Sequence, residues 1–504
     1  MASPDDAVKS LDAARADTSF FGHPRGLSTL FFTEMGERFS YYGMRAILIY
    51  YMTHKIAEGG LEFGLPQAGA VYGLYTAMVY LLCLGGGWVA DRITGQRRAV
   101  LIGGVMIAVG EFCLAVPSET TFYCGLVLLM MGTGMLKGNV STIVGQLYKQ
   151  GDPRRDSGFS LFYMGINLGA LISPLVVPLV AKYYGYRMGF AVAGFGMLGG
   201  LLQYVLGGKH LGSAGAHPAT TGDAEKDRRQ QRSAALAVGG GLAFFAILAA
   251  LGAAGVITFT ATMISNTLGW CLLAIVAVVF SWLIFGAGWS IEERKRSAAI
   301  LVLFIASALF WASFEQAGST LSLFAQDATN RMVLGWEFPA GWFQNVESSV
   351  VVILAPVFAW FWLKLARRNA EPSSPTKFCV ALFLGGSAFA ILVPASIMAA
   401  HGTKVAIWWL IGTYLLQGLG ELCLSPVGLS ALSKLAPARA AGFMMGLWFL
   451  SNSIGNWTAG KAASVSSSVP LPTLFGVVAG FTFVAALVLA ALIKPTKKLM
   501  AGIN

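Results

Sequence analysis

The sequence predicts an all-α polytopic membrane protein, and three features carry this prediction. Of the 504 residues, 56% are hydrophobic and only 12% are charged, whereas a soluble domain carries roughly 25% charged residues. Apolar runs of about 20 residues, the length that spans a bilayer, recur along the whole chain. The Lys and Arg residues gather between these runs. A disordered chain, a disulfide scaffold and an ordinary cytosolic enzyme are therefore excluded.

About fourteen apolar runs are candidate transmembrane helices. They lie near residues 27–53, 67–90, 99–116, 121–147, 158–181, 188–207, 233–256, 262–289, 299–325, 341–363, 378–400, 405–433, 441–460 and 471–493. Of the 35 Lys and Arg residues, 26 lie in the tails and even-numbered loops, six lie in the opposite loops and three lie inside runs. Because basic residues favour the cytoplasmic side, both termini are expected in the cytoplasm. The net charge of +11 thus reflects topology, and no nucleic-acid partner is expected.

A polar linker divides the chain after the sixth run. The two runs that follow it carry no charged residue, which predicts a lipid-facing hairpin inserted between two six-helix bundles. This layout is typical of secondary transporters whose halves rock about a site at the membrane midplane. The expected parts are a cytoplasmic tail (1–26), a first bundle (27–207), the cytoplasmic linker (208–232), the hairpin (233–290), a second bundle (291–494) and a cytoplasmic tail (495–504).

The cysteines and histidines indicate neither a metal site nor a histidine-based proton relay. The six cysteines lie in apolar runs without CxxC spacing, which is typical of buried small hydrophobic residues. The five histidines lie in tails, in loops or at the ends of runs. We therefore expect no metal and no cofactor, and any transported proton must be carried by carboxylates.

Apart from Glu111, which lies near the outer end of its run, eight charged residues lie inside the runs, where each costs at least about 2.5–3.5 kcal/mol. They are Glu34, Glu37, Arg38, Arg45, Lys137, Glu315, Glu347 and Glu421. Since five carboxylates accompany three cations, complete ionisation would leave a charge of −2, and an uncompensated buried charge is expensive. One or two carboxylates should therefore hold a proton at neutral pH or await a cationic group of a substrate.

The first run presents its polar residues on one face. At about 100° per residue they cover an arc of roughly 140°. The members of this stripe are Glu34, Glu37, Arg38, Tyr41, Tyr42 and Arg45. For Glu34 and Arg38, internal salt bridges that fix helix packing and a functional role both remain open. The depth of Arg45 in its run favours function.

Three residues are each the single charge of a long apolar run, namely Lys137, Glu315 and Glu421. The buried cations all belong to the front half. Ion pairs between them and carboxylates of the back half would keep the helix bundle closed on one side of the membrane. Such pairs would open when protons or substrate compete for them. Static buried pairs are the alternative.

Other positions give weaker signals. Glu111 and Glu347 lie near the outer ends of their runs; Glu111 is expected to reach the interface, and for Glu347 a cavity and the aqueous vestibule both remain open. Asn167 could bond a neighbouring helix or a ligand amide. Aromatic residues that could line a pocket, although packing is their commoner role in a span, are Tyr41, Tyr80 and Trp448.

Six motifs resemble those of the proton-dependent oligopeptide transporter (POT/PTR) family of the major facilitator superfamily. They are EMGERFSYYG (34–43), GxxxDRxxGxRR (87–98), GTGMLKGN (132–139), FYMGINLG (162–169), FEQ (314–316) and GELCLSPVGLS (420–430). The first is quite specific to the family, whereas DRxxGxRR occurs across the superfamily. The resemblance runs from about residue 20 to 495 and implies the major facilitator fold, with the extra helix pair of bacterial-type members.

The resemblance also implies roles for individual residues. Proton coupling would involve Glu34, Glu37, Arg38, Lys137 and Glu315. The peptide carboxylate would be held by Lys137 and Arg45 with Tyr41 and Tyr80, the amine by Glu421 and the backbone by Asn167, and Glu347 and Trp448 complete the predicted peptide site. The pairs Arg45–Glu315 and Lys137–Glu421 would close the outer gate.

The sequence departs from the family pattern at two positions. Glu347 stands where members usually have Asn, which places an additional acid near the amine end of the site. This predicts a stronger electrostatic attraction for the terminal amine of the peptide. Gly73 stands near the position of a histidine that animal members use. The second departure agrees with proton coupling through carboxylates.

The expected function is proton-coupled symport of di- and tripeptides across a bacterial inner membrane, by a carrier that works as a monomer in the lipid bilayer and is driven by the proton gradient. A carrier of another small anion, such as nitrate, and a peptide sensor of the same fold remain alternatives. A membrane enzyme is disfavoured because the sequence has no nucleophile motif, no phosphate loop and no metal cluster.

Overall fold

The computed structural model describes residues 4–149, 152–218, 223–256, 258–286, 288–436 and 441–500. The chain forms two compact units. Unit 1 consists of Met1–Met44 and Leu81–Thr260, and unit 2 consists of Arg45–Tyr80 and Ala261–Asn504. Parts of the predicted tails and linker lie outside the described residues, and the predicted domain boundaries stay a prediction.

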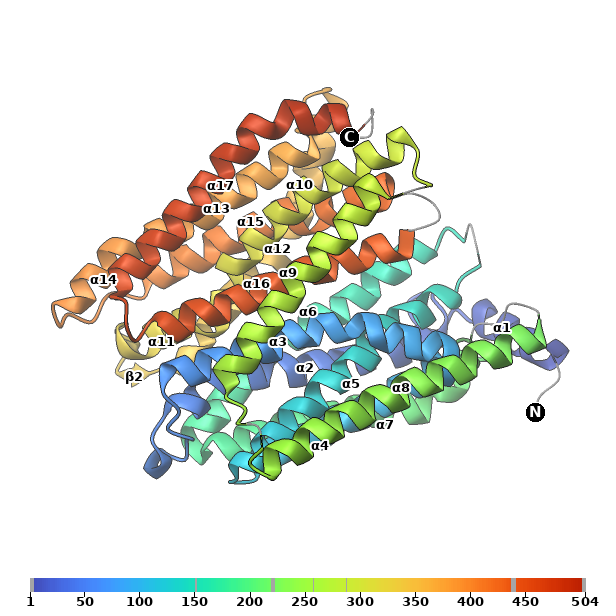
Figure 1. Ribbon diagram of the computed structural model, residues 1–504, viewed down its shortest axis with the longest axis horizontal. Helices are drawn as coiled ribbons and strands as arrows, with labels where there is room; N and C mark the ends of the chain where they lie inside the picture. The colour runs from blue at the N-terminus through green and yellow to red at the C-terminus, as the bar shows by residue number, and fades with distance from the viewer. Residues whose placement is uncertain are drawn as a thin grey trace. The chain divides into compact units, whose positions relative to one another are not determined.

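Unit 1 is helical, and its helix α4 packs against both α5 and α7 (Figure 1). Its elements are α1 (Pro4–Ala16), the first part of α2 (Arg25–Thr53), the end of α3 (Leu65–Val89), the π-helical turn η2 (Ala90–Thr94), α4 (Gln96–Ala115), α5 (Glu119–Gln146), α6 (Arg155–Tyr184), α7 (Tyr186–Gly207), the 3₁₀ turn η3 (Gly208–Leu211) and α8 (Ala224–Ala253).

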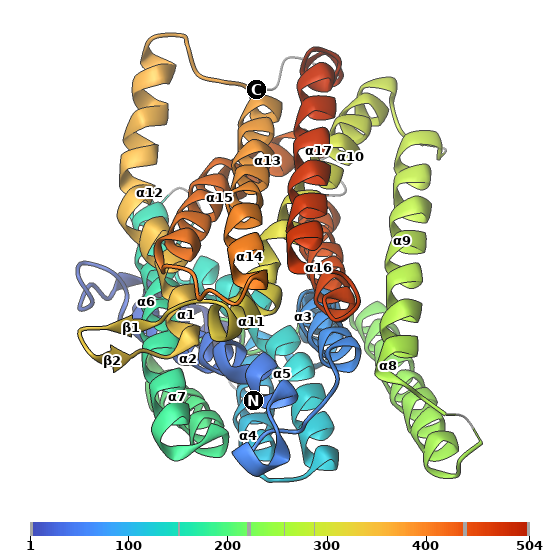
Figure 2. The ribbon, with the colours of Figure 1, turned by 90° about the vertical axis from the view of Figure 1, so that its left-hand side faces the viewer.

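Unit 2 is also helical apart from one small hairpin of two antiparallel strands (Figure 2). It contains the remainder of α2 and α3 with the turn η1 (Ile56–Glu58), then α9 (Ala261–Phe285), α10 (Ile291–Phe314), η4 (Glu315–Gly318), α11 (Thr320–Asp327), β1 (Met332–Val333), β2 (Trp336–Glu337), η5 (Ala340–Phe343), α12 (Gln344–Arg367), α13 (Ser374–Ala390), α14 (Leu392–Ala400), α15 (Trp408–Leu435), α16 (Ala441–Val465) and α17 (Leu471–Leu499).

The helices have the lengths that a multi-pass membrane protein requires. Twelve helical segments in the described part of the chain are long and apolar enough to span a bilayer. Two more helices have the length, α2 with 29 residues and α16 with 25, since a helix of 25 residues is about 37 Å long and the hydrocarbon core is about 30 Å thick. The predicted all-α membrane fold with about fourteen spanning helices is therefore confirmed.

Hydrogen bonds explain why residues 45–80 belong to unit 2. The Tyr50 hydroxyl donates to the carbonyl of Ser322 at 2.9 Å, and the Ser453 hydroxyl donates to the carbonyl of Ala77 at 2.8 Å. In the predicted orientation these residues lie toward the outer side of the membrane. The outer parts of α2 and α3 are thus bonded to helices of the back half.

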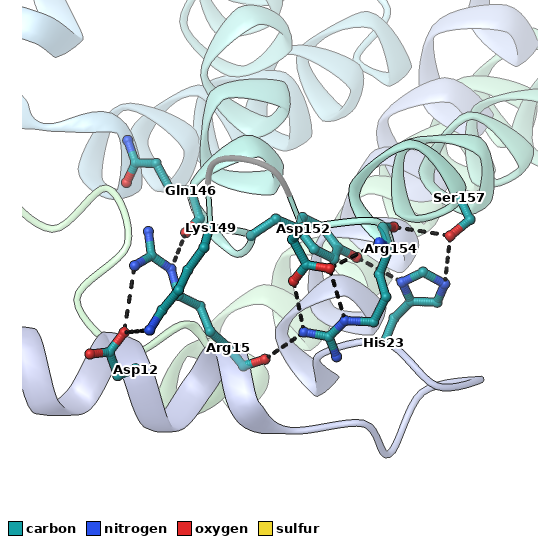
Figure 3. Close-up of polar contacts among 9 residues, drawn as sticks. Asp12, Arg15, His23, Gln146, Lys149, Asp152, Arg154 and Ser157 are labelled. Atoms are coloured by element: carbon teal, nitrogen blue, oxygen red, sulfur yellow. Dashed lines mark hydrogen bonds and ion pairs between the residues drawn. The ribbon is translucent and has the colours of Figure 1, made fainter.

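The N-terminal helix is clasped to the connection between α5 and α6 (Figure 3). Arg15 Nε donates to the carbonyl of Gln146 at 3.0 Å, and Arg154 Nη2 donates to the carbonyl of Arg15 at 3.1 Å. Arg15 therefore caps the C-terminal end of α5, and Arg154 caps the C-terminal end of α1. A cation is favourable at both positions. Asp12 adds an ion pair with Lys149 at 3.1 Å.

A buried histidine completes this clasp. His23 is only 7% exposed, its Nδ1 lies 3.0 Å from the Tyr148 hydroxyl, and its Nε2 lies 3.4 Å from the Ser157 hydroxyl. A neutral imidazole satisfies both contacts, since it accepts at one nitrogen and donates at the other. Burial, reinforced by the Arg154 guanidinium and opposed by Asp152, lowers the pKa of His23.

We expect acid to loosen the clasp. Because the pKa of His23 is lowered on folding, the neutral ring contributes stability that is present above about pH 6.5, the unfolded value, and is lost as the pH falls below it. Amide hydrogen exchange in residues 145–149 and 152–158, corrected for intrinsic rates, should accelerate between pH 7.5 and 5.5 in the wild type. It should accelerate less in His23→Gln, whereas His401→Gln, at an exposed position, should behave as wild type. Equal acceleration in the wild type and His23→Gln would contradict the assignment.

Candidate functional site

The buried charges of α2 form one cluster in unit 1. Glu34, Glu37 and Arg38 are 1%, 0% and 6% exposed. Arg38 Nη2 donates to Glu34 Oε1 at 2.8 Å, and Arg38 Nε lies 3.1 Å from Glu37 Oε2. The four-residue spacing places Glu34 on the same helix face as Arg38, whereas Glu37 directly precedes Arg38 and its contact is a finding of the structure. One arginine is thus shared between two acids.

Lys137 of α5 belongs to the same cluster. Its side chain is half-buried and lies close enough to Glu34, Glu37 and Arg38 to interact with them electrostatically. With Lys137 included, the cluster holds two acids and two bases and is electrically balanced. A proton that binds to either carboxylate frees one of the bases for another partner.

Unit 2 contains a second buried pair. Arg45 Nη2 lies 2.5 Å from Glu315 Oε2, and Arg45 Nε donates to the Tyr72 hydroxyl at 2.8 Å. The three side chains are 6%, 2% and 0% exposed. Glu315 follows the last residue of α10, at the start of η4, so this contact ties α2 to the point where the back-half helix changes course.

The remaining two acids of unit 2 lie on α12 and α15. Glu347 occupies the first turn of α12 and interacts electrostatically with Glu421 of α15 and with Arg45. Glu421 in turn interacts with Glu315. Both side chains are half-buried. No Lys or Arg in the described part of unit 2 forms an ion pair with either. Lys137 belongs to unit 1, so its pairing with Glu421 stays a prediction.

The charges of the two units differ in balance. Two acids accompany two bases in the cluster of unit 1, whereas Glu315, Glu347 and Glu421 accompany only Arg45 in unit 2. Among the eight residues named from the sequence, the deficit of two positive charges therefore lies in unit 2, while Glu111 adds one more buried acid to unit 1. Half-buried carboxylates that share one arginine and, among the described residues, form no ion pair of their own are suited to bind protons or an ammonium group.

The other predicted site residues occupy different surroundings. Asn167 Nδ2 donates to the carbonyl of Tyr163, four residues earlier in its own helix, at 2.8 Å, so its amide N–H is satisfied within α6. Trp448 of α16 is 6% exposed, and its ring packs on Gly428 of α15. Tyr41 is buried and Tyr80 is half-buried. Whether these four residues contact a ligand stays a prediction.

Sequence reasoning missed the contact of Tyr72 and gave Glu111 the wrong surroundings. Tyr72 bonds Arg45, but tyrosines at several positions of the same apolar run look alike in the sequence. Glu111 was expected to reach the interface, and this expectation is wrong: its side chain is 0% exposed and accepts a hydrogen bond from the Ser40 hydroxyl at 2.8 Å. Packing of α4 against α7 encloses it, which the position near the end of an apolar run did not reveal.

Comparisons with known proteins agree with this arrangement. The POT family model matches residues 97–477. The peptide transporter YePEPT of Yersinia enterocolitica is 39% identical over 96% of this chain and 96% of that protein. The di-/tripeptide transporter of Lactococcus lactis subsp. cremoris is 33% identical over 97% of this chain and 99% of that protein. A crystal structure of a peptide transporter POT in complex with sulfate has a TM-score of 0.91 and 40% identity, covering 99% of this chain and 100% of that chain.

Proposed function

The chain belongs to the POT family of membrane transporters, and from this premise we propose that it is a proton-coupled symporter that imports di- and tripeptides by alternating access. As a member of this family it is a transporter and not an enzyme. The single observation that carries the proposal is the charge distribution, with a balanced cluster in unit 1 and three buried or half-buried carboxylates around one arginine in unit 2. Protons and a peptide ammonium are the cations that this deficit would accept.

A short peptide has the complementary chemistry. It is a zwitterion with constant ends and variable side chains, and it extends by about 3.3–3.6 Å per residue. Its amine would be held by Glu421 with Glu347 nearby, and its carboxylate by Arg45 and Lys137. Residues that complete the proposed peptide site are Tyr41, Tyr80, Asn167 and Trp448.

The proton would be carried by the buried carboxylates. Protonation of Glu37 releases Lys137, which can then hold the peptide carboxylate, and Glu34 with Arg38 sets the position of Glu37. Protonation of Glu315 would release Arg45 in the same way. The observed Arg45–Glu315 contact supports a closed outer gate, for which Lys137–Glu421 is the proposed second pair.

The proposed setting is a bacterial inner membrane with both termini in the cytoplasm. A proton that moves down 100 mV supplies about 2.3 kcal/mol, so one to a few protons could sustain accumulation. The protein would work as a monomer in the lipid bilayer, without a cofactor.

Counterflow in proteoliposomes tests the substrate class without any gradient. Labelled dialanine should exchange with unlabelled dialanine or trialanine inside the liposomes and not with nitrate. Exchange with nitrate alone would favour a carrier of another anion. Saturable binding without exchange would favour a sensor.

Glu347→Asn should weaken binding of free-amine dialanine by about three- to ten-fold, because it removes one of two carboxylates near the amine. Binding to purified protein, measured by calorimetry, checks this, with Glu119→Gln at an exposed position as the control. Unchanged affinity for every peptide tested would place Glu347 outside the site.

A further inference from the structure

Small and hydroxyl side chains form a seam along α2, beside its charged stripe. At about 100° per residue, Thr29, Thr33, Gly36 and Ser40 fall within an arc of roughly 60°. Thr29 and Thr33 donate to carbonyls of α7, those of Gly207 and Gly200, at 3.3 Å each. At Gly36 a β-carbon would lie 2.9 Å from the α-carbon of Gly200, so the two backbones touch.

Ser40 extends this seam from α7 to α4. Its hydroxyl donates to Glu111 Oε1 at 2.8 Å, and both side chains are 0% exposed. A β-carbon on Gly194 of α7 would lie 3.2 Å from the β-carbon of Glu111, so a glycine of α7 makes room for the acid. The seam is thus held at successive turns, first by α7 and then by Glu111.

Glu111 has no counter-charge. Its Oε2 is buried without a hydrogen-bond partner, and no ion pair in the described part of the chain involves it. An ionised carboxylate with one neutral partner is costly inside a membrane protein, so the group is favoured as the neutral acid.

The seam adjoins the charged stripe. Ser40 follows Glu37 by three residues, which is about one turn, so a rotation of α2 about its axis would move Ser40 and Glu37 together. We propose that Glu111 is a positioning residue: as a neutral acid it accepts from Ser40, fixes the rotation of α2, and keeps Glu37 beside Lys137. This inference rests on the proposed role of that cluster in proton coupling.

Three variants separate positioning from proton carriage. Glu111→Gln keeps a neutral acceptor of the same shape, Glu111→Leu removes the acceptor, and Ser40→Ala removes the donor. In proteoliposomes, Glu111→Gln should keep proton-driven dialanine uptake within about two-fold of wild type with an unchanged pH profile. Glu111→Leu and Ser40→Ala should each lose about ten-fold or more, because a small displacement of coupled groups is costly, while gradient-free counterflow persists.

Two results would overturn the proposal. If Glu111→Gln loses gradient-driven uptake as Glu111→Leu does, the acid carries a proton and does not merely position α2. If folded Ser40→Ala takes up dialanine under a proton gradient as well as the wild type does, the bond has no role. Ser40→Ala is the milder variant, so it still tests the proposal if Glu111→Leu does not fold. Melting temperatures over the Ser40→Ala, Glu111→Leu double-mutant cycle, in which each single substitution removes the bond, report the bond whatever the substrate, so they distinguish failure of this inference from failure of the proposed function. Additive shifts would show that the bond is absent.

Discussion

Replacing Lys137 with alanine is expected to abolish gradient-driven accumulation of peptide, with a loss of at least about 100-fold. The cluster of Glu34, Glu37, Arg38 and Lys137 is electrically balanced, and removal of one partner from a buried set of charges typically costs 3–5 kcal/mol. Glu37 would then keep its proton throughout the transport cycle. Proton release would no longer be coupled to the conformational change. Uptake into proteoliposomes under a proton gradient measures this loss.

A matched control keeps the prediction specific to the cluster. Lys182→Ala removes a lysine at the exposed end of α6 and should accumulate dialanine as the wild type does. Counterflow without a gradient should survive in Lys137→Ala to a measurable extent. Accumulation by Lys137→Ala at the wild-type level would remove the coupling scheme.

The second large effect is expected at Glu421. Glu421→Gln should weaken binding of free-amine dipeptides by about 10- to 100-fold, the range of a hydrogen bond to a charged group. Dipeptides with a blocked amine should bind to the variant and to the wild type with similar affinity, because they have no ammonium to lose. Calorimetry with paired free and N-acetylated dipeptides measures the difference.

The control for Glu421 is Glu292→Gln, which changes an exposed acid in the first turn of α10 and should leave both affinities unchanged. An equal loss for free and blocked peptides in Glu421→Gln would defeat the assignment of the amine to this residue. It would point instead to a general disturbance of α15.

Much of the fold could be predicted because a bilayer imposes strict rules. The length of apolar runs gave the all-α class and the approximate number of spanning helices, and the 3.6-residue period placed Glu34, Glu37 and Arg38 on one face of α2. The contact of Arg38 with Glu34, four residues earlier, follows from this spacing, whereas its contact with the adjacent Glu37 does not.

The parts of the site that depend on tertiary packing were less accessible. The sequence gives no reason to prefer Tyr72 over other tyrosines of its run as the partner of Arg45. Glu111 appeared to be an interfacial residue because position in a run reports depth and not the neighbours that enclose a side chain. The localisation of the charge deficit to unit 2 likewise required knowing which residues share a unit.

Uptake of labelled dialanine into liposomes that hold the purified protein tests the central claim most directly. The gradient should be acid outside and negative inside, and matched liposomes without a gradient provide the reference. The proposed function predicts accumulation above the equilibrium level only with the gradient, and excess trialanine should block it. Folded protein that gives the same final level with and without the gradient, or no uptake at all, would contradict proton-coupled peptide symport.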